Sequence, residues 1–395
     1  MKVLLTHRFF WPDTAPYAVI LRTIGDALAE AGHEVHVLSS LPSYRSDTRS
    51  SARKHERLGA LEVRRIWVFR DEKRNSLRRL ANVVLYCFAL FSRILLLRPG
   101  VVTASTFPPV IAAWSACLAA RLVGAKFVYH IQDIHPEISI ISGGGLGRGL
   151  PMKALLWLDN QTLRRADTII TLSEDMADTL RARGLGPLPI TLINNPAISS
   201  DDKPITPPSE LVKSPDKIRV VFAGNHGRYQ NLPLLAEGVA RCFEAHPELE
   251  LMFLGDGMAL GELKSRWGDH PQVCFVPFLP FAEARDIISQ ADIGLVSLSP
   301  GIYRAAYPSK VLSYAGLGVP MLALVEPESE LAKALCENGI GSVPVENTPE
   351  AVAYALEELL SRRVASNSVV EWHQTIAGSA QILARWRLLM QGMEQ

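Results

Sequence analysis

The first 195 residues alternate short apolar runs with longer stretches of helical periodicity. The opening run MKVLLTH is followed by a proline-containing loop, by VILRTIGDALAEAG with apolar residues at helical spacing, and by a second run, HEVHVLSS. Further apolar runs follow, separated by helical stretches: LEVRRIWVF, GVVTAST, AKFVYHI, TIITLS and ITLINN. Continuous apolar strands that alternate with helices predict a parallel sheet covered by helices on both faces.

The alternation stops at residues 196–217, which hold five prolines, and restarts at IRVVFAG. We therefore predict an α/β protein with two doubly wound, Rossmann-like domains, at 1–195 and 218–370, joined by a linker at 196–217. A C-terminal helix over 371–395 is expected to pack back on the first domain. Ligands of such sheets bind at the carboxyl ends of the strands, so we expect the site in a cleft between the domains.

Composition excludes several classes of protein. The 395 residues are 48% hydrophobic and 21% charged, a globular balance that excludes a disordered or collagen-like chain. The five cysteines lie far apart and form no C-x-x-C pair, which favours buried thiols of a reduced compartment over a disulfide framework or a zinc site. Charged and aromatic residues follow directly on the short apolar run at the start, MKVLLTHRFF, so we expect no secretion signal.

Positive charge is concentrated in residues 45–98, which hold 14 Lys and Arg against 5 Asp and Glu. A patch of this kind is typical of proteins that bind nucleic acid or an anionic membrane. Within it, residues 80–97 form an apolar block interrupted by Arg93, which fits a transmembrane, a buried or an interfacial helix. We favour the interfacial helix, because the apolar block follows the charges instead of interleaving with them as in nucleic-acid sites. The cations expected to meet anionic headgroups are Arg70, Lys73, Arg74, Arg78 and Arg79.

The strongest site motif joins an apolar strand to a helix through Gly224-Asn225-His226-Gly227. Glycines let a backbone approach a phosphate closely, a helix start offers unpaired N–H groups, and Arg228 adds a guanidinium fork. The motif is neither a Walker loop nor G-x-G-x-x-G, so an ordinary strand–turn–helix connection is the alternative.

Two further motifs lie in the same predicted domain. The segment YPSKV at 307–311 has the pattern of a helix start, with Ser309 near the cap. Lys310 in the first turn has the wrong sign for the helix dipole, which favours a bound anion beside it; the alternative is a surface lysine. Gly255 and Asp256 belong to another strand-end glycine turn, for which an ordinary turn is equally typical.

In the first domain, HIQDIHPE gathers His130, Asp133, His135 and Glu137 at a strand end. Histidine serves as an acid, a base or a hydrogen-bond donor to a sugar, and carboxylates orient hydroxyls. A metal site is disfavoured, because a strand alternates its faces and no fourth ligand is apparent. The alternative for His130 is a strand-end histidine satisfied by hydrogen bonds.

Together these motifs resemble the retaining GT-B glycosyltransferases of family GT4, and among them the members that assemble capsule, O-antigen or exopolysaccharide. The resemblance covers nearly the whole chain, and it rests on the order and spacing of motifs that are individually weak. The motifs are FWPDTAPYA, GHEVHVLSS, HIQDIHPE, TLSEDMADTL, LINNP, FAGNHGRYQN, FLGDG and YPSKVLSYAGLGVPMLA.

The resemblance implies a GT-B fold with a nucleotide-sugar donor in the second domain, no cofactor and no metal, because basic groups stabilise the leaving diphosphate. It implies that the catalytic residues are His130, Asp133, Arg228 and Lys310. It places the donor at Gly224, Asn225, His226, Gly227, Gln230, Gly255, Asp256, Pro277, Phe278, Tyr307, Pro308, Ser309, Val311 and Ser313. It places the acceptor side at Asp13, Thr14, Ala15 and Glu137.

The chain departs from the family pattern at three places. Gln230 stands where the family has a lysine after its glycine loop, and Ala305 and Ser313 stand where it has paired glutamates. The N-terminal glycine loop is replaced by DTAP at 13–16. These departures bear on the identity of the donor more than on the activity.

The sequence therefore predicts a cytoplasmic glycosyltransferase, peripheral to the inner face of the plasma membrane. It would move a sugar from a nucleoside-diphosphate donor to a lipid-linked or polysaccharide acceptor with retention of anomeric configuration, and it would not bind nucleic acid. Two alternatives stay open. A sugar-nucleotide 2-epimerase shares the architecture but has little use for a basic apolar segment, and a non-catalytic partner subunit would explain the missing glutamates.

Overall fold

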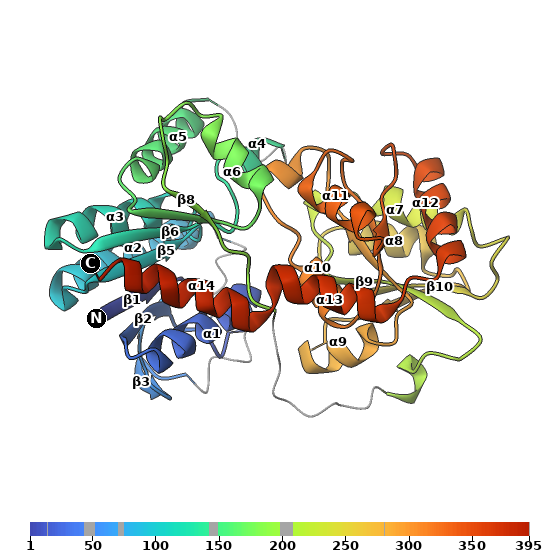
Figure 1. The fold of residues 1–395 in the computed structure, drawn as a ribbon, viewed down its shortest axis with the longest axis horizontal. Helices are drawn as coiled ribbons and strands as arrows, with labels where there is room; N and C mark the ends of the chain where they lie inside the picture. Colours follow the sequence, from blue (N-terminus) through green and yellow to red (C-terminus); the bar gives the residue numbers. More distant parts are fainter. Residues whose placement is uncertain are drawn as a thin grey trace. The chain divides into compact units, whose positions relative to one another are not determined.

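A computed structural model describes residues 1–13, 15–42, 52–69, 75–141, 149–197, 208–279 and 281–394. Among the predicted site residues, Thr14, Arg70, Lys73 and Arg74 lie outside this description, as does the side chain of Arg228, and so does much of the predicted linker. The chain forms two compact units (Figure 1): unit 1 comprises Met1–Pro196 and Ser379–Gln395, and unit 2 comprises Ala197–Gly378. Each is an α/β unit built on a largely parallel sheet, which confirms the predicted fold class.

The sheet of unit 1 has the strand order β3-β4-β2-β1-β5-β6-β7-β8. Its strands are β1 (Lys2–Thr6), β2 (Glu34–Ser40), β3 (His55–Leu58), β4 (Leu61–Ile66), β5 (Val101–Ser105), β6 (Lys126–His130), β7 (Thr168–Thr171) and β8 (Ile190–Leu192). The central strands are buried on both faces, which explains why they appear in the sequence as continuous apolar runs. Strand β3 differs from the prediction, because it pairs antiparallel with β4 at the edge of the sheet.

The helices of unit 1 are α1 (Pro16–Glu30), α2 (Ser76–Leu97), α3 (Ile111–Val123), α4 (Glu137–Ile141), α5 (Gly149–Leu163), α6 (Glu174–Arg181) and α14 (Ser379–Gly392). Helix α3 packs against both α2 and α5, whereas α1 packs against α14. Arg387 of α14 contributes to the second contact by donating to Glu30 Oε2 at 2.9 Å. The last helix of the chain therefore completes the unit that the first strand begins.

Unit 2 is an all-parallel sheet with the order β11-β10-β9-β12-β13-β14. Its strands are β9 (Ile218–Asn225), β10 (Leu249–Asp256), β11 (Val273–Val276), β12 (Ile293–Ser297), β13 (Met321–Leu324) and β14 (Gly341–Ser342). Its helices are α7 (Leu232–Ala240), α8 (Leu260–Trp267), α9 (Phe281–Ile288), α10 (Lys310–Gly316), α11 (Glu330–Glu337), α12 (Pro349–Arg362) and α13 (Ser366–Ala377). One core cluster joins β9, β10 and β12 to α7 and α12.

Both sheets contain a point where the direction of winding reverses. In unit 2 the chain runs outward from β9 to β11 and then returns to place β12 on the other side of β9. In unit 1 it runs outward from β1 to β4 and returns to place β5 beside β1. Loops diverge at such points and leave room for a ligand at the carboxyl ends of the strands. The loops after β9 and β12, and those after β1 and β5, are therefore the places to look for a site.

Helix α2 has one buried and one exposed face. Asn82, Tyr86, Leu90 and Ile94 are buried, but only 28% of its most apolar window is buried inside the unit. Among the described helices it is the one whose length and composition would suffice to cross a membrane, at a mean hydropathy of 2.1. These properties do not fit the alternative of a buried core helix.

The predicted C-terminal helix over 371–395 is two helices, α13 and α14, broken at Gly378. At Gly378 the backbone leaves the helical conformation, with φ −51° and ψ 117°. A Cβ there would lie 2.5 Å from the carbonyl oxygen of Gln374, so this bend requires glycine. Helix α13 packs on α10 within unit 2, and α14 packs on α1 within unit 1. The chain therefore changes unit at this glycine.

Candidate active site

The loop that follows β9 in unit 2 lies directly against the loop that follows β10. The N–H of His226 donates to the carbonyl of Asp256 at 2.9 Å, and the N–H of Ala259 donates to the carbonyl of His226 at 3.0 Å. A Cβ at Gly255 would lie 2.0 Å from the oxygen of Gly224, so this approach requires glycine. The glycine turn at 255–257 therefore has a packing role, whatever ligand lies beside it.

The loop that follows β12 closes on the same place. Ser299 N–H donates to the carbonyl of Tyr229 at 2.6 Å, and Ser297 Oγ donates to the carbonyl of Gln230. These bonds hold the loop after β9 against the loop after β12, at the reversal point of the sheet. Helix α10 then begins with Ser309 at its N-cap, as predicted, although the Ser309 side chain makes no capping hydrogen bond.

Lys310 points inward from the start of α10. The residue as a whole is partly exposed, but its Nζ is shielded from solvent and lies 3.2 Å from the centre of the Phe222 ring. Burial lowers the pKa of Lys310 well below its usual value. An ammonium held over an aromatic ring gains a cation–π interaction but no hydrogen bond. The alternative of a simple surface lysine is therefore wrong.

Lys310 Nζ belongs to a group of buried polar atoms that find no hydrogen-bond partner among the described residues. The others are both ring nitrogens of His226 and Oε1 of Gln230. Burial, together with the charge of Lys310, lowers the pKa of His226 to about 4. Buried polar atoms of this kind also occur elsewhere in both units, but these four come from the segments that follow β9 and β12, the two strands at the reversal point of the sheet. A phosphate or another polar ligand at that point would supply the hydrogen bonds that they lack.

The other predicted donor residues lie at the carboxyl ends of three neighbouring strands of this sheet and at the start of α10. Gly224 and Asn225 end β9, Asp256 ends β10, and Pro277 and Phe278 follow β11, all of them exposed. At the start of α10 lie Tyr307, Pro308, Ser309, Val311 and Ser313. Of these, Val311 is fully buried, so its side chain supports the helix and is not available to a ligand.

In unit 1, His130 ends β6 and is only 1% exposed. Asn195 Nδ2 donates to Gln132 Oε1 at 2.8 Å, and Gln132 Nε2 donates to His130 Nε2 at 2.8 Å. His130 Nδ1 therefore carries the proton and donates to the Tyr17 hydroxyl oxygen at 2.7 Å. Burial lowers the pKa of His130 to about 3, so the ring is neutral. Both ring nitrogens are thus engaged within unit 1.

Three of the residues around His130 come from distant parts of the chain and were not predicted. Trp386 of α14 packs its ring 5.1 Å from that of His130, and Tyr17 comes from the first turn of α1. Asn195 appeared in the sequence only as part of LINNP. No local pattern connects these positions to His130, because each contact forms only when the sheet and α14 are assembled.

Asp133 follows His130 on the loop after β6. Its N–H donates to Thr106 Oγ1 at 3.3 Å, so the loop is held against the loop after β5. Burial raises the pKa of the Asp133 carboxyl to about 6. A carboxyl that titrates near neutral pH at the end of a strand has the property expected of a group that accepts a proton or orients a hydroxyl.

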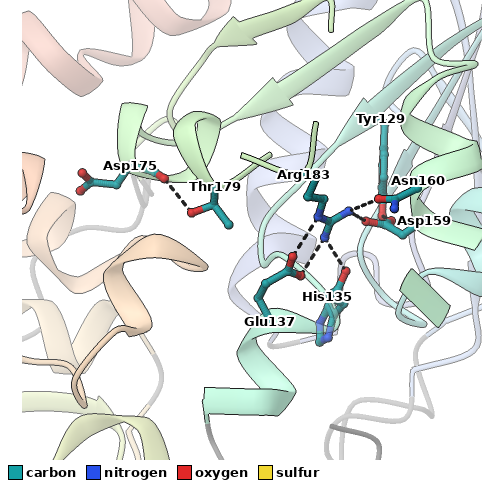
Figure 2. A network of polar contacts seen from close by, with 8 residues as sticks. All are labelled: Tyr129, His135, Glu137, Asp159, Asn160, Asp175, Thr179 and Arg183. Carbon is teal, nitrogen blue, oxygen red and sulfur yellow. Dashed lines mark hydrogen bonds and ion pairs between the residues drawn. The ribbon is translucent and has the colours of Figure 1, made fainter. Parts of the chain in front are cut away.

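Glu137, predicted on the acceptor side, is bound to Arg183 (Figure 2). Arg183 Nε and Nη2 donate to the two carboxylate oxygens of Glu137 at 2.8 and 2.7 Å. Arg183 Nη1 also donates to Asp159 Oδ2 at 2.6 Å, and Asp159 Oδ1 accepts from the Tyr129 hydroxyl at 2.8 Å. Arg183, which follows α6, therefore binds Glu137 of α4 and Asp159 of α5 at the same time. It is a structural residue that the sequence did not reveal.

The other acceptor-side positions lie in the loop after β1. Asp13 is 2% exposed, and its N–H donates to the carbonyl of Phe10 at 3.0 Å. Ala15 packs with Phe9 and Ala18 in a small apolar cluster. The side chains of Asp13 and Ala15 thus face the interior of unit 1. Across the described residues of both units, no group of three or more His, Cys, Asp and Glu is arranged to hold a metal ion.

Comparison with known proteins agrees with this architecture. Residues 17–196 match the glycosyl transferase 4-like domain, and residues 217–362 match the glycosyl transferases group 1 domain. WcaI of Escherichia coli, named as a glycosyl transferase of colanic acid biosynthesis, is 24% identical over 95% of this chain and 94% of its own length. WbjE of Pseudomonas aeruginosa, named a probable glycosyltransferase, is 23% identical over 72% of this chain and 71% of its own.

Among solved structures, sucrose-phosphate synthase from Thermosynechococcus elongatus has the same fold. It superposes with a TM-score of 0.75 at 13% identity and covers 100% of this chain and 99% of its own. The two family matches together span most of the chain. The first lies within unit 1, and the second lies within unit 2. The chain therefore belongs to the glycosyltransferases and is an enzyme of the GT-B fold.

Proposed function

We propose that this enzyme transfers a sugar from a nucleoside-diphosphate donor to a lipid-linked or polysaccharide acceptor during cell-surface polysaccharide assembly. The observation that carries the donor site is the buried, unpaired Nζ of Lys310, beside the equally unpaired His226 and Gln230. A diphosphate would accept hydrogen bonds from the lysine and the histidine, and it would restore the charge that burial disfavours on Lys310. The acceptor class is supported by the name of WcaI.

The proposed chemistry keeps the configuration of the transferred sugar. The acceptor hydroxyl forms its bond to the anomeric carbon on the face from which the diphosphate leaves, and its proton passes to the leaving phosphate oxygen. Lys310, together with Arg228 of the loop after β9, would neutralise the charge that develops on the diphosphate, so no divalent metal and no cofactor are required. Asp133 would orient the acceptor hydroxyl, and neutral His130 would fix the shape of the strand end.

We place the enzyme in the cytoplasm, at the inner face of the plasma membrane.

A thermal-shift screen against UDP, GDP, ADP, CMP and dTDP, with and without magnesium, tests the donor site. We expect one diphosphate to raise the unfolding temperature equally in both conditions, and its base narrows the choice of sugar. A 2-epimerase would instead convert the nucleotide sugar without any acceptor. A non-catalytic subunit would bind none of the nucleotides, and that result would contradict the proposal.

Lys310→Ala provides the residue-level test, with Lys333→Ala as its matched control, since Lys333 is an exposed lysine in the same unit. Removing a group that stabilises a leaving diphosphate is expected to lower turnover by roughly two orders of magnitude and to abolish the thermal shift. The Lys333→Ala variant should keep both the turnover and the thermal shift of wild type. Near-normal turnover in Lys310→Ala would rule out the site assignment.

A further inference from the structure

The outward face of α2 carries a continuous apolar surface. Leu77 is 78% exposed, Phe88 71% and Leu96 78%, whereas Tyr86 and Leu90 on the opposite face are buried. Large apolar side chains exposed in a contiguous patch mark an interaction surface. The patch must therefore be explained by a partner and not by the packing of unit 1.

Two aromatic residues that follow β4 extend this surface. Trp67 is 48% exposed, and its ring meets that of Phe69 at 4.5 Å in an edge-to-face pair. Phe69 is fixed to α2, because its N–H donates to Asn82 Oδ1 at 2.7 Å and its carbonyl accepts from Asn82 Nδ2 at 3.0 Å. Between the aromatic pair and the helix lies an apolar hollow of about 770 Å³, which is lined by Trp67, Phe69, Leu77, Leu80, Ala81, Val84 and Leu85.

The helix lies along the surface of unit 1 and belongs to its fold. Its inner face packs on α3, where Ser115 Oγ donates to the carbonyl of Cys87 at 3.0 Å. Arg93 interrupts the apolar stretch, and burial lowers the pKa of Arg93, with Arg64 and Glu62 of β4 as its charged neighbours. A helix that crossed a bilayer would have to leave α3 and carry Arg93 into the hydrocarbon. The contacts therefore favour a helix that lies in the plane of an interface.

The charges around α2 indicate which kind of partner its apolar face binds. Residues 73–98 hold six Lys and Arg and no Asp or Glu, and among the described residues Arg78, Arg79 and Arg98 are exposed at the two ends of the helix. Cations in the first turn oppose the helix dipole, so Arg78 and Arg79 do not serve the stability of α2. A second copy of the same face would bring like charges together. An anionic lipid surface matches both the apolar face and the positive ends.

We infer that the outer face of α2, with Trp67 and Phe69, docks the enzyme on an anionic bilayer. The apolar side chains enter the boundary between headgroups and acyl chains, and Arg78, Arg79 and Arg98 meet the headgroups. The inference deepens the proposed function, on which it rests for the idea of a membrane-bound acceptor, and it identifies the surface that would bring the enzyme to that acceptor.

Co-sedimentation of the full chain with phosphatidylcholine vesicles, with and without phosphatidylglycerol, tests the inference. We expect binding that depends on phosphatidylglycerol and is reversed by high salt, because exposed charges are screened. Leu80→Ser with Phe88→Ser should weaken partitioning at least tenfold, since each removes an apolar side chain from the acyl boundary. Val345→Ser, at an exposed apolar position of unit 2, is the matched control and should bind like wild type.

Arg78→Gln with Arg79→Gln should reduce binding to the anionic vesicles about fivefold for each arginine and leave binding to phosphatidylcholine unchanged. Lys333→Gln is the control for charge. Equal binding by wild type and the paired serine variant would overturn the inference. Binding that resists both high salt and alkaline extraction would show a spanning helix, and a dimer abolished by Phe88→Ser would show a second copy as the partner; either result would also overturn it.

Nucleotide binding measured on the same samples separates the inference from the proposed function. Wild type that binds a nucleoside diphosphate but no vesicles overturns only the docking surface. Wild type that binds vesicles but no nucleoside diphosphate overturns only the donor site.

Discussion

Asp133 is a residue whose ionisation destabilises the folded state near neutral pH. Its pKa is about 6 in the fold, against 3.8 for an unperturbed aspartate. Because the folded state holds the proton more tightly than the unfolded chain does, Asp133 contributes most favourably to stability below pH 3.8. That contribution is lost as the pH rises through 6. A destabilising carboxylate retained at a strand end is typical of a group placed for chemistry.

Asp133→Asn is therefore expected to raise the unfolding temperature at pH 7.5 by a few degrees, corresponding to at most about 3 kcal/mol. The gain should shrink as the pH is lowered through 6 and vanish near pH 4, because wild type is then protonated as well. The same variant should lose transferase activity. Thermal unfolding of both proteins across this pH range is the measurement, and a pH-independent difference would contradict the assigned cause.

At the scale of single residues, the sequence predicted the positions that are local in the chain and missed those that are not. The turn at Gly224–Gly227 and the helix start at Lys310 were recognisable, because a strand, a turn and a helix follow one another directly. The partner of His130 was not, since Tyr17 lies 113 residues away. The ion pair of Glu137 was not recognisable either, since Arg183 lies 46 residues further on.

At the scale of elements, Arg183 joins three helices that have little other contact with one another. It follows α6 and binds Glu137 of α4 and Asp159 of α5, and Asp159 is almost fully buried. An arginine fork satisfies both carboxylates at once, which a lysine could not do with the same geometry. The arrangement of α4, α5 and α6 therefore depends on one guanidinium.

Arg183→Ala is expected to destabilise the protein by about 3 kcal/mol or more, because it leaves two carboxylates in a buried site without their counterion. Arg181→Ala, two residues earlier, is the matched control. Arg181 also binds two carboxylates, those of Glu174 and Asp178, but on the exposed surface, so its loss should cost less than about 1 kcal/mol. Urea unfolding measures the free energy of unfolding that each variant loses. Similar losses in the two variants would contradict the role of burial.

The elements that were predicted correctly are those with strong apolar patterns. The buried strands and α1 follow from such patterns, and the exposed face of α2 was expected from the charges beside it. Strand β3 was missed because its sequence, HERL, is polar and its pairing with β4 comes from the edge of the sheet. The break at Gly378 was missed because glycine alone does not distinguish a kink from the change of unit that occurs there.

At the scale of the whole molecule, unit 1 is assembled from the two ends of the sequence. Helix α14 covers α1, and its Trp386 is buried against His130, more than 250 residues away in the chain. The fold of each domain was predictable from its own alternation of strands and helices. The packing of a C-terminal helix on the first domain was expected, but the residues that it contacts were not, since the apolar positions of α14 do not identify the helix on which it packs.

Trp386→Ala is expected to destabilise unit 1 by about 3–5 kcal/mol, as for a large aromatic side chain removed from a core. Leu388→Ala on the same helix is the control, because Leu388 is 65% exposed and should have almost no effect. Diphosphate binding by unit 2 should persist in both variants under folding conditions. Thermal unfolding followed by tryptophan fluorescence measures the difference, and equal stability would place Trp386 outside the core.

The return of the chain to unit 1 also sets an order of events during synthesis. A ribosome makes β1 to β8 first, then the whole of unit 2, and only afterwards the helix that covers α1. For all of that time the apolar face of α1 and the ring of His130 lack their cover, whereas unit 2 already has every segment it needs. Unit 2 can therefore fold before unit 1 is complete, and the apolar face of α1 stays exposed until α14 has been made.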